Sequence, residues 1–195
     1  MTDHDALADR GRALEEEYFR RRDRELIEKM RQAAIADQAR GAMGEKTGLQ
    51  DPALLKDLQT LGFTPDTVVL LPLVPVLEMA WAEGGITAAE RDLIVRLARR
   101  RGVVEASAAD RQLGEWMANR PNPSVFAHAG RLTAAMLESG SDQAASGLTA
   151  DELVAYCEKI AAASGGILGL RLGSVSAEEK SLLSRIASEL KTRQP

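Results

Sequence analysis

Aromatic residues and cysteine are scarce in this chain of 195 residues, and each scarcity narrows the class of protein. Phe, Trp and Tyr together make up 4%, while most apolar residues are Ala and Leu, a composition that favours helices over β-sheets. Cys157 is the single cysteine. It excludes an internal disulfide bond and predicts a reducing, cytoplasmic compartment, and we expect it to be a buried, unreactive thiol. With only His4 and His128 beside it, no zinc-site spacing is present.

Long hydrophobic runs and a large excess of one charge are also missing. The longest apolar run, residues 68–77, has ten residues including two prolines, whereas a helix that spans a bilayer needs about 20. The charged start of the chain predicts no secretory signal peptide. The formal net charge of −4 argues against a dedicated nucleic-acid binder. Hydrophobic residues still make up 45%, so we expect a soluble protein with a packed core.

Signals for the start of a helix recur at short intervals after residue 50. Asp51-Pro52 and Asn122-Pro123 each place a capping side chain before a proline at the first helical position. Capping boxes, in which Ser or Thr is followed three residues later by Glu, begin at Thr87, Thr149 and Ser176. No window alternates convincingly as a β-strand does. The sequence therefore predicts an all-α fold, a helical bundle of about eight helices joined by short loops.

Residues 1–40 predict one long charged helix, because they hold ten acidic and nine basic side chains. Glu16 and Arg20 are one of several pairs four residues apart, each of which stabilises a solvated helix by about 0.2–0.5 kcal/mol. A narrow apolar stripe also recurs at helical spacing; its members are Leu7, Leu14, Tyr18, Leu26, Met30 and Ala33. We therefore predict a helix over 1–40, a flexible linker over 41–50 and a helical domain over 51–195.

Two segments of the chain resemble each other and predict an internal repeat. Residues 86–98 and 175–187 match at an offset of 89, each with an apolar residue, a capping hydroxyl and a Glu three residues later. Upstream, Ala82-Glu83-Gly84 matches Ala163-Ser164-Gly165 at an offset of 81. Each unit is predicted to be a helix, a Gly-containing turn and a capped helix, since repeated units stack around a shared core.

The first unit resembles a known family. Residues 81–91, Trp-Ala-Glu-Gly-Gly-Ile-Thr-Ala-Ala-Glu-Arg, are similar to the turn of TerB-like tellurite-resistance proteins. The family pattern is Ala-Asp-Gly, a variable residue, an aliphatic residue, Ser or Thr, two variable residues and Glu. The resemblance is clearest over residues 73–101 and extends loosely to about residue 190. It implies an all-helical bacterial protein of tellurite resistance or another stress response, with acidic turn residues that bind a divalent metal.

Carried over residue by residue, the resemblance implies a metal site at the first turn. Glu83 takes the place of the family Asp and has one more methylene, Gly84 matches the family Gly, and Glu90 matches the capping Glu. Glu78 adds a third carboxylate, and hard cations take six to eight oxygen ligands. In the alternative interpretation, Gly84 and Gly85 supply positive φ in a helix–helix turn while Glu90 caps the next helix.

A run of small residues at 161–173 is the most unusual stretch of the chain. Gly165, Gly169 and Gly173 recur every fourth residue, a spacing that lets another backbone approach closely. Tight packing inside the bundle is one interpretation. The other is contact with a partner or a membrane surface through the apolar side chains Ile167, Leu168, Leu170 and Leu172.

These features together predict a non-enzymatic stress-response or scaffolding module that binds a protein partner or forms a homo-oligomer. The candidate partner-binding residues are Leu14, Tyr18, Leu26, Met30, Gly165, Gly169 and Gly173. Two alternatives stay open: a divalent-metal-binding regulatory module that uses Glu78, Glu83 and Glu90, and a peripheral membrane adaptor. The sequence shows no catalytic constellation, and it predicts no nucleic-acid partner and no small-molecule substrate.

Overall fold

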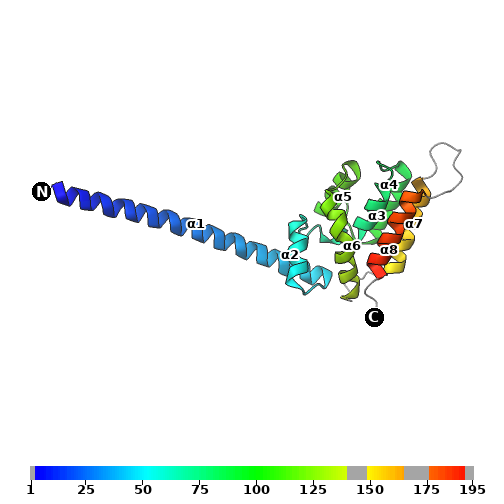
Figure 1. Cartoon of the computed structure of the whole chain (residues 1–195), viewed down its shortest axis with the longest axis horizontal. Helices are drawn as coiled ribbons and strands as arrows, with labels where there is room; N and C mark the ends of the chain where they lie inside the picture. The colour runs from blue at the N-terminus through cyan, green and yellow to red at the C-terminus, as the bar shows by residue number, and fades with distance from the viewer. Residues whose placement is uncertain (1–2, 140–148, 165–175, 192–195) are drawn as a thin grey trace. The chain divides into compact units, whose positions relative to one another are not determined.

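The computed structural model describes residues 3–139, 149–164 and 176–191, and the side chains of residues 15–139, 149–163 and 176–191. Within these ranges it contains eight α-helices and no β-strand, which confirms the predicted all-α class (Figure 1). The elements are α1 (Asp3–Thr47), α2 (Pro52–Thr60), the 3₁₀ helix η1 (Val68–Leu73), α3 (Val74–Ala80), α4 (Ala88–Arg100), α5 (Ala108–Ala118), α6 (Pro123–Glu138), α7 (Ala150–Ser164) and α8 (Ala177–Lys191). No helix within the described ranges is both long enough and apolar enough to cross a bilayer.

The chain divides into two compact units, residues 1–41 and residues 42–195. The first unit consists of most of α1, the long charged helix that the sequence predicted. The second unit contains the last six residues of α1 together with η1 and α2–α8. The predicted charged helix, residues 1–40, therefore ends within one residue of the boundary between the two units.

The predicted flexible linker over residues 41–50 is mostly helical instead. Helix α1 continues through this segment to Thr47. A Cβ atom on Gly44 would lie 2.9 Å from the backbone oxygen of Leu49. Close backbone packing, and not flexibility, therefore accounts for this glycine. Met43, one residue earlier, is completely buried. The end of α1 is therefore part of the core of the second unit.

The longest apolar run of the sequence forms the centre of the second unit. It folds as η1 and the start of α3, and every side chain of α3 except Glu78 is buried. Helix α3 packs against α4, α6, α7 and α8. A helix that is apolar on all sides must be covered on all sides, and the four longer helices around α3 provide that cover. Pro75 lies in its first turn, where the missing N–H costs little.

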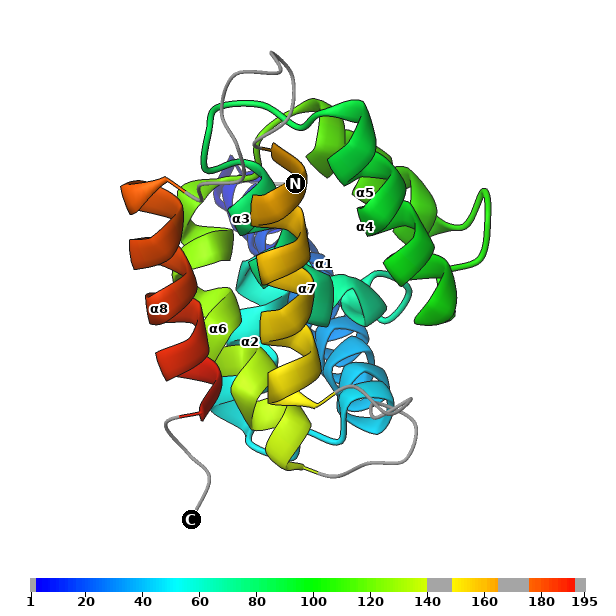
Figure 2. The same ribbon diagram turned by 90° about the vertical axis from the view of Figure 1, so that its right-hand side faces the viewer.

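The helix pairs α3–α4 and α7–α8 correspond to the two units of the predicted repeat. Helices α4 and α8 begin at residues 88 and 177, which preserves the offset found in the sequence. Helix α3 packs against α7, and each of these helices also contacts the second helix of the other pair. Figure 2 shows α7 and α8 side by side and running in opposite directions. These reciprocal contacts are what two related units produce when they share one core.

The predicted N-terminal caps form throughout the second unit. In the three capping boxes, a Glu carboxylate accepts a hydrogen bond of 2.7–2.8 Å from the backbone N–H of Thr87, Thr149 or Ser176. The capping hydroxyl in turn accepts from the N–H of that Glu at 3.1–3.3 Å. Asp51 and Asn122 accept from N–H groups two residues later. The caps satisfy donors that have no partner within a helix, and so fix where each helix begins.

Candidate functional site

Large hydrophobic side chains remain exposed along α1. Their exposed fractions range from 50% to 65%, and they are Tyr18, Phe19, Leu26, Ile27, Met30 and Ile35. Among the side chains that the structure describes in the second unit, Val104 is the one large hydrophobic with comparable exposure. Scattered apolar residues are normal on a protein surface, whereas a concentration of them marks an interaction surface. We call these six residues the α1 surface.

The α1 surface contains three of the four predicted partner-binding residues of the N-terminal helix. Tyr18, Leu26 and Met30 are all at least half exposed. The side chain of Leu14 lies outside the described residues. The predicted small-residue patch, Gly165, Gly169 and Gly173, lies outside them as well. Of the two predicted partner-binding patches, the α1 surface is the one that the structure describes.

Sequence reasoning missed Phe19, Ile27 and Ile35 on the same helix. Phe19 lies on the same face as Leu26, because seven residues make nearly two full turns, and Met30 follows one turn later. The predicted stripe included Tyr18 instead, which points about 100° away from Phe19. The adjacent pairs Tyr18-Phe19 and Leu26-Ile27 could have indicated Phe19 and Ile27, since two adjacent apolar residues widen an apolar stripe on a helix.

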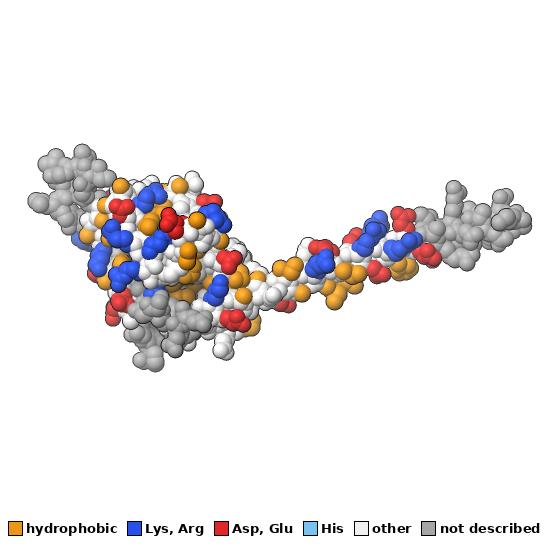
Figure 3. Space-filling model, turned by 180° about the vertical axis from the view of Figure 1, so that it is seen from behind, with side chains coloured by type: hydrophobic (Ala, Val, Ile, Leu, Met, Phe, Trp, Pro, Cys, Tyr) orange, Lys and Arg blue, Asp and Glu red, His pale blue; other side chains and the backbone are white. Residues whose placement is uncertain are grey.

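Charged side chains of both signs lie among the apolar ones, as Figure 3 shows along α1. Glu16 and Arg20 form an ion pair at 3.6 Å, and Arg22 and Glu25 form one at 3.8 Å. The four charged groups are more than half exposed, so each pair contributes about 0.2–1 kcal/mol at most. These pairs stabilise the isolated helix without covering its apolar side chains.

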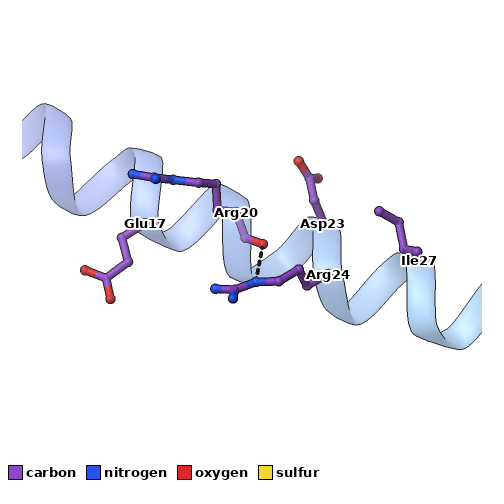
Figure 4. Close-up of a pocket in the computed structure, with 5 residues that line it drawn as sticks. All are labelled: Glu17, Arg20, Asp23, Arg24 and Ile27. Carbon is purple, nitrogen blue, oxygen red and sulfur yellow. Dashed lines mark hydrogen bonds between the residues drawn. The ribbon is translucent and has the colours of Figure 1, made fainter.

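A hollow along α1 is lined by Glu17, Arg20, Asp23, Arg24 and Ile27. Figure 4 shows that all five residues belong to this one helix and that their charged ends point apart. The guanidinium Nε of Arg24 donates to the backbone oxygen of Arg20 at 3.2 Å. A small-molecule site needs polar groups that converge on one ligand inside an enclosed pocket. This hollow lies along a single helix and its polar groups diverge, so it is not such a site.

The three predicted metal-ligating residues have different surroundings. Glu83 is exposed in the turn after α3. Glu90 is 1% exposed, and its carboxylate accepts a 2.7 Å hydrogen bond from the backbone N–H of Thr87. Glu78 forms an ion pair with Arg185 of α8 at 2.5 Å. Two of the three carboxylates therefore already have a partner within the protein.

The acidic turn has the backbone of a helix–helix turn. Gly84 has φ of 89°, as the alternative interpretation of the sequence expected, whereas Gly85 has no positive φ. Glu90 caps α4, as that interpretation also expected. Among the residues that the structure describes, no three His, Cys, Asp or Glu side chains form a group that could hold a metal ion. The metal-binding alternative stays a prediction.

The capping carboxylates of α4 and α8 lie close enough to influence each other. Burial raises the pKa of Glu90, the hydrogen bonds with Thr87 lower it, and the nearby carboxylates of Glu83 and Glu179 raise it. Glu179 is the capping Glu of α8 and is 2% exposed. The repeat therefore places two buried acidic caps near each other, an arrangement that the sequence did not reveal.

Cys157 is completely buried on α7, as predicted. Burial, together with the negative charges of Glu78 and Glu158, raises the pKa of its thiol to about 12. A thiol with this pKa carries almost no thiolate at neutral pH, and the thiolate is the reactive form. Cys157 is therefore a packing residue in the folded protein.

Comparisons of the chain with protein-family models, with curated proteins and with solved structures found no significant match. The resemblance of residues 81–91 to the TerB-like turn therefore stays a prediction.

Proposed function

We propose that this chain is a non-enzymatic interaction module that binds a protein partner through the α1 surface. The observation that carries the proposal is the exposure of 50–65% for six large hydrophobic side chains on one helix. Full burial of one such side chain is worth about 1.5–3 kcal/mol relative to exposure. A partner that covers several of these side chains gains much of that burial free energy, whereas the isolated helix leaves them in water.

The composition of the α1 surface supports a protein partner. Tyr, Phe, Met and Arg are enriched at protein–protein interfaces, and α1 has Tyr18, Phe19 and Met30 among four closely spaced arginines. The spacing of Phe19, Leu26 and Met30 is that of a helix face that packs against another helix. A helical partner is therefore the best fit to this surface.

The scaffolding or stress-response role rests on a separate observation. Its support is the resemblance of residues 81–91 to the turn of TerB-like tellurite-resistance proteins. Metal sensing by the second unit would need Glu83, whereas a purely structural turn would not. Because partner binding by α1 does not involve Glu83, partner binding and metal sensing can be tested separately.

The test replaces Tyr18 and Leu26 together by Asp in the full chain. We expect Y18D/L26D to lose captured partner proteins and any self-association, because two charges then lie within the apolar surface. The matched control is Gln32→Asp with Gln38→Asp, which adds the same charge to exposed polar positions of α1. Light scattering gives the oligomeric state, and affinity capture gives the partners. Wild-type behaviour of Y18D/L26D in both measurements would make the proposal wrong.

A further inference from the structure

The charged residues of α1 form four blocks of alternating sign. Block one, residues 15–17, has three Glu, and block two, residues 20–24, has four Arg and one Asp. Block three, residues 25–28, has two Glu, and block four, residues 29–31, has one Lys and one Arg. The signs run negative, positive, negative, positive, and they run in the opposite order when the helix is followed backwards.

We infer that the partner of the α1 surface is a second copy of this chain, whose α1 packs antiparallel to the first. The inference rests on the proposed function, since it names the partner for the same surface. In an antiparallel pair centred between residues 22 and 23, block one faces block four, and Arg20 of block two faces Glu25 of block three, so these facing charges are opposite. The rest of block two lies at the centre and faces itself, with Arg22 opposite Asp23 and Arg21 opposite Arg24. In a parallel pair in register, each block faces its own copy, and all four facing pairs repel. Flanking charges of this kind set the orientation of paired helices.

The apolar residues of α1 are consistent with the same arrangement. The doublets Tyr18-Phe19 and Leu26-Ile27 are symmetric about residues 22 and 23, and blocks one and four are symmetric about nearly the same point. An antiparallel pair centred there places Phe19 of one copy opposite Leu26 of the other. The register that pairs block one with block four therefore also places apolar side chains against each other.

The charged groups are free to form these contacts. Glu16 and Arg20 have side chains that are 73% and 70% exposed, and Arg22 and Glu25 are 63% and 51% exposed. Their ion pairs within the helix are long, at 3.6 and 3.8 Å. Exposed pairs of this kind are weak, so the same side chains can exchange partners with a second helix.

Charge exchange between blocks tests the inference on the full chain. We expect the wild type to be a dimer by sedimentation equilibrium, with at least tenfold weaker association when Glu15, Glu16 and Glu17 are all replaced by Lys. Replacing Lys29 and Arg31 by Glu should weaken it in the same way. Both changes in one chain, or a mixture of the two variants, should restore the dimer, because block one again faces the opposite charge. Glu15→Asp, Glu16→Asp and Glu17→Asp together are the matched control that keeps the sign.

Cysteine cross-linking tests the orientation directly. In the antiparallel pair, Asp23→Cys lies at the centre and should link to itself, whereas Glu16→Cys should link to Lys29→Cys and not to itself. Two copies of residue 16 would be about 20 Å apart along the pair, and a disulfide needs Cα atoms within about 7 Å. Cys157 is completely buried and does not compete.

Four results would decide between the inference and the function on which it rests. A dimer in which Glu16→Cys links to itself is parallel and overturns the inference. A dimer that the exchange of block charges leaves unchanged overturns it as well. A monomeric wild type overturns it too, yet leaves the proposed function standing if Y18D/L26D abolishes capture of a different partner. A monomer whose captured partners are unaffected by Y18D/L26D overturns both.

Discussion

Replacing Glu90 by Gln tests which form of the buried capping carboxylate of α4 stabilises the fold. Burial raises the pKa of Glu90 above its ordinary value of 4.5. A carboxyl group whose pKa is raised on folding binds its proton more tightly in the folded state. Its contribution to stability is therefore fully present below its ordinary pKa and is lost as the pH rises through the raised folded pKa. At neutral pH the folded protein bears the cost of the charge.

Glutamine keeps an oxygen that accepts from the backbone N–H of Thr87 and removes that charge. We therefore expect Glu90→Gln to be at least as stable as the wild type at about pH 7. Its advantage should disappear as the pH falls to about 4, where the wild-type group becomes protonated. Glu90→Ala should instead lose the cap, at a cost of about 1 kcal/mol. In a chain of this size that lowers Tm by about 2–4 °C.

Thermal unfolding followed by circular dichroism between these two pH values measures both effects. The matched control is Glu152→Gln in the capping box of α7. Glu152 accepts the equivalent hydrogen bond at 2.8 Å, but it is exposed, so its replacement should give little dependence on pH. The reasoning is refuted if Glu90→Gln is as unstable as Glu90→Ala at neutral pH, since the ionised carboxylate would then be the stabilising form.

Three further predictions concern the rest of the second unit. Arg185→Ala should lower the free energy of unfolding by about 1 kcal/mol, because it leaves the mostly buried Glu78 without its ion pair. Arg185→Lys should recover part of that loss, as measured by urea titration. The thiol of Cys157 should react with a thiol reagent only after unfolding in denaturant, and fast reaction of the folded protein would contradict its burial. Calcium, magnesium, manganese and zinc should not shift Tm of the chelator-treated protein; a stabilisation of about 2.7 kcal/mol at 100 times Kd that Glu83→Gln removes would favour the metal alternative.

The helix starts of this fold were predictable because each depends on residues close in sequence. A capping box needs a hydroxyl and a Glu three residues apart, and all three predicted boxes form. The proximity of Glu90 and Glu179 was not predictable in this way. It depends on how α4 and α8 pack around α3 and α7, which is a property of the whole bundle. Local signals predicted where the helices begin but not which of their caps would be buried together.

The linker at residues 41–50 shows a tertiary contact overriding a local preference. Glycine is about 1 kcal/mol less favourable than Ala in a helix, so Gly41 and Gly44 predicted a break. In the structure, the close approach of the Leu49 backbone requires a small residue at Gly44, and the burial of Met43 favours a continuous helix. The same glycine pattern is compatible with a flexible linker and with a tightly packed turn, and only the packing distinguishes them.

In the proposed antiparallel pair, attraction and orientation come from different side chains of α1. The six residues of the α1 surface provide attraction, but hydrophobic contact has no direction and would favour almost any apolar partner. Specificity requires a difference in affinity between partners, and repulsion of the wrong one is an effective way to obtain it. In the proposed pair, blocks one and four repel a parallel copy and attract an antiparallel one. A helix with the same apolar residues and charges of a single sign throughout would repel a second copy of itself in either orientation, and would choose a partner of the opposite charge.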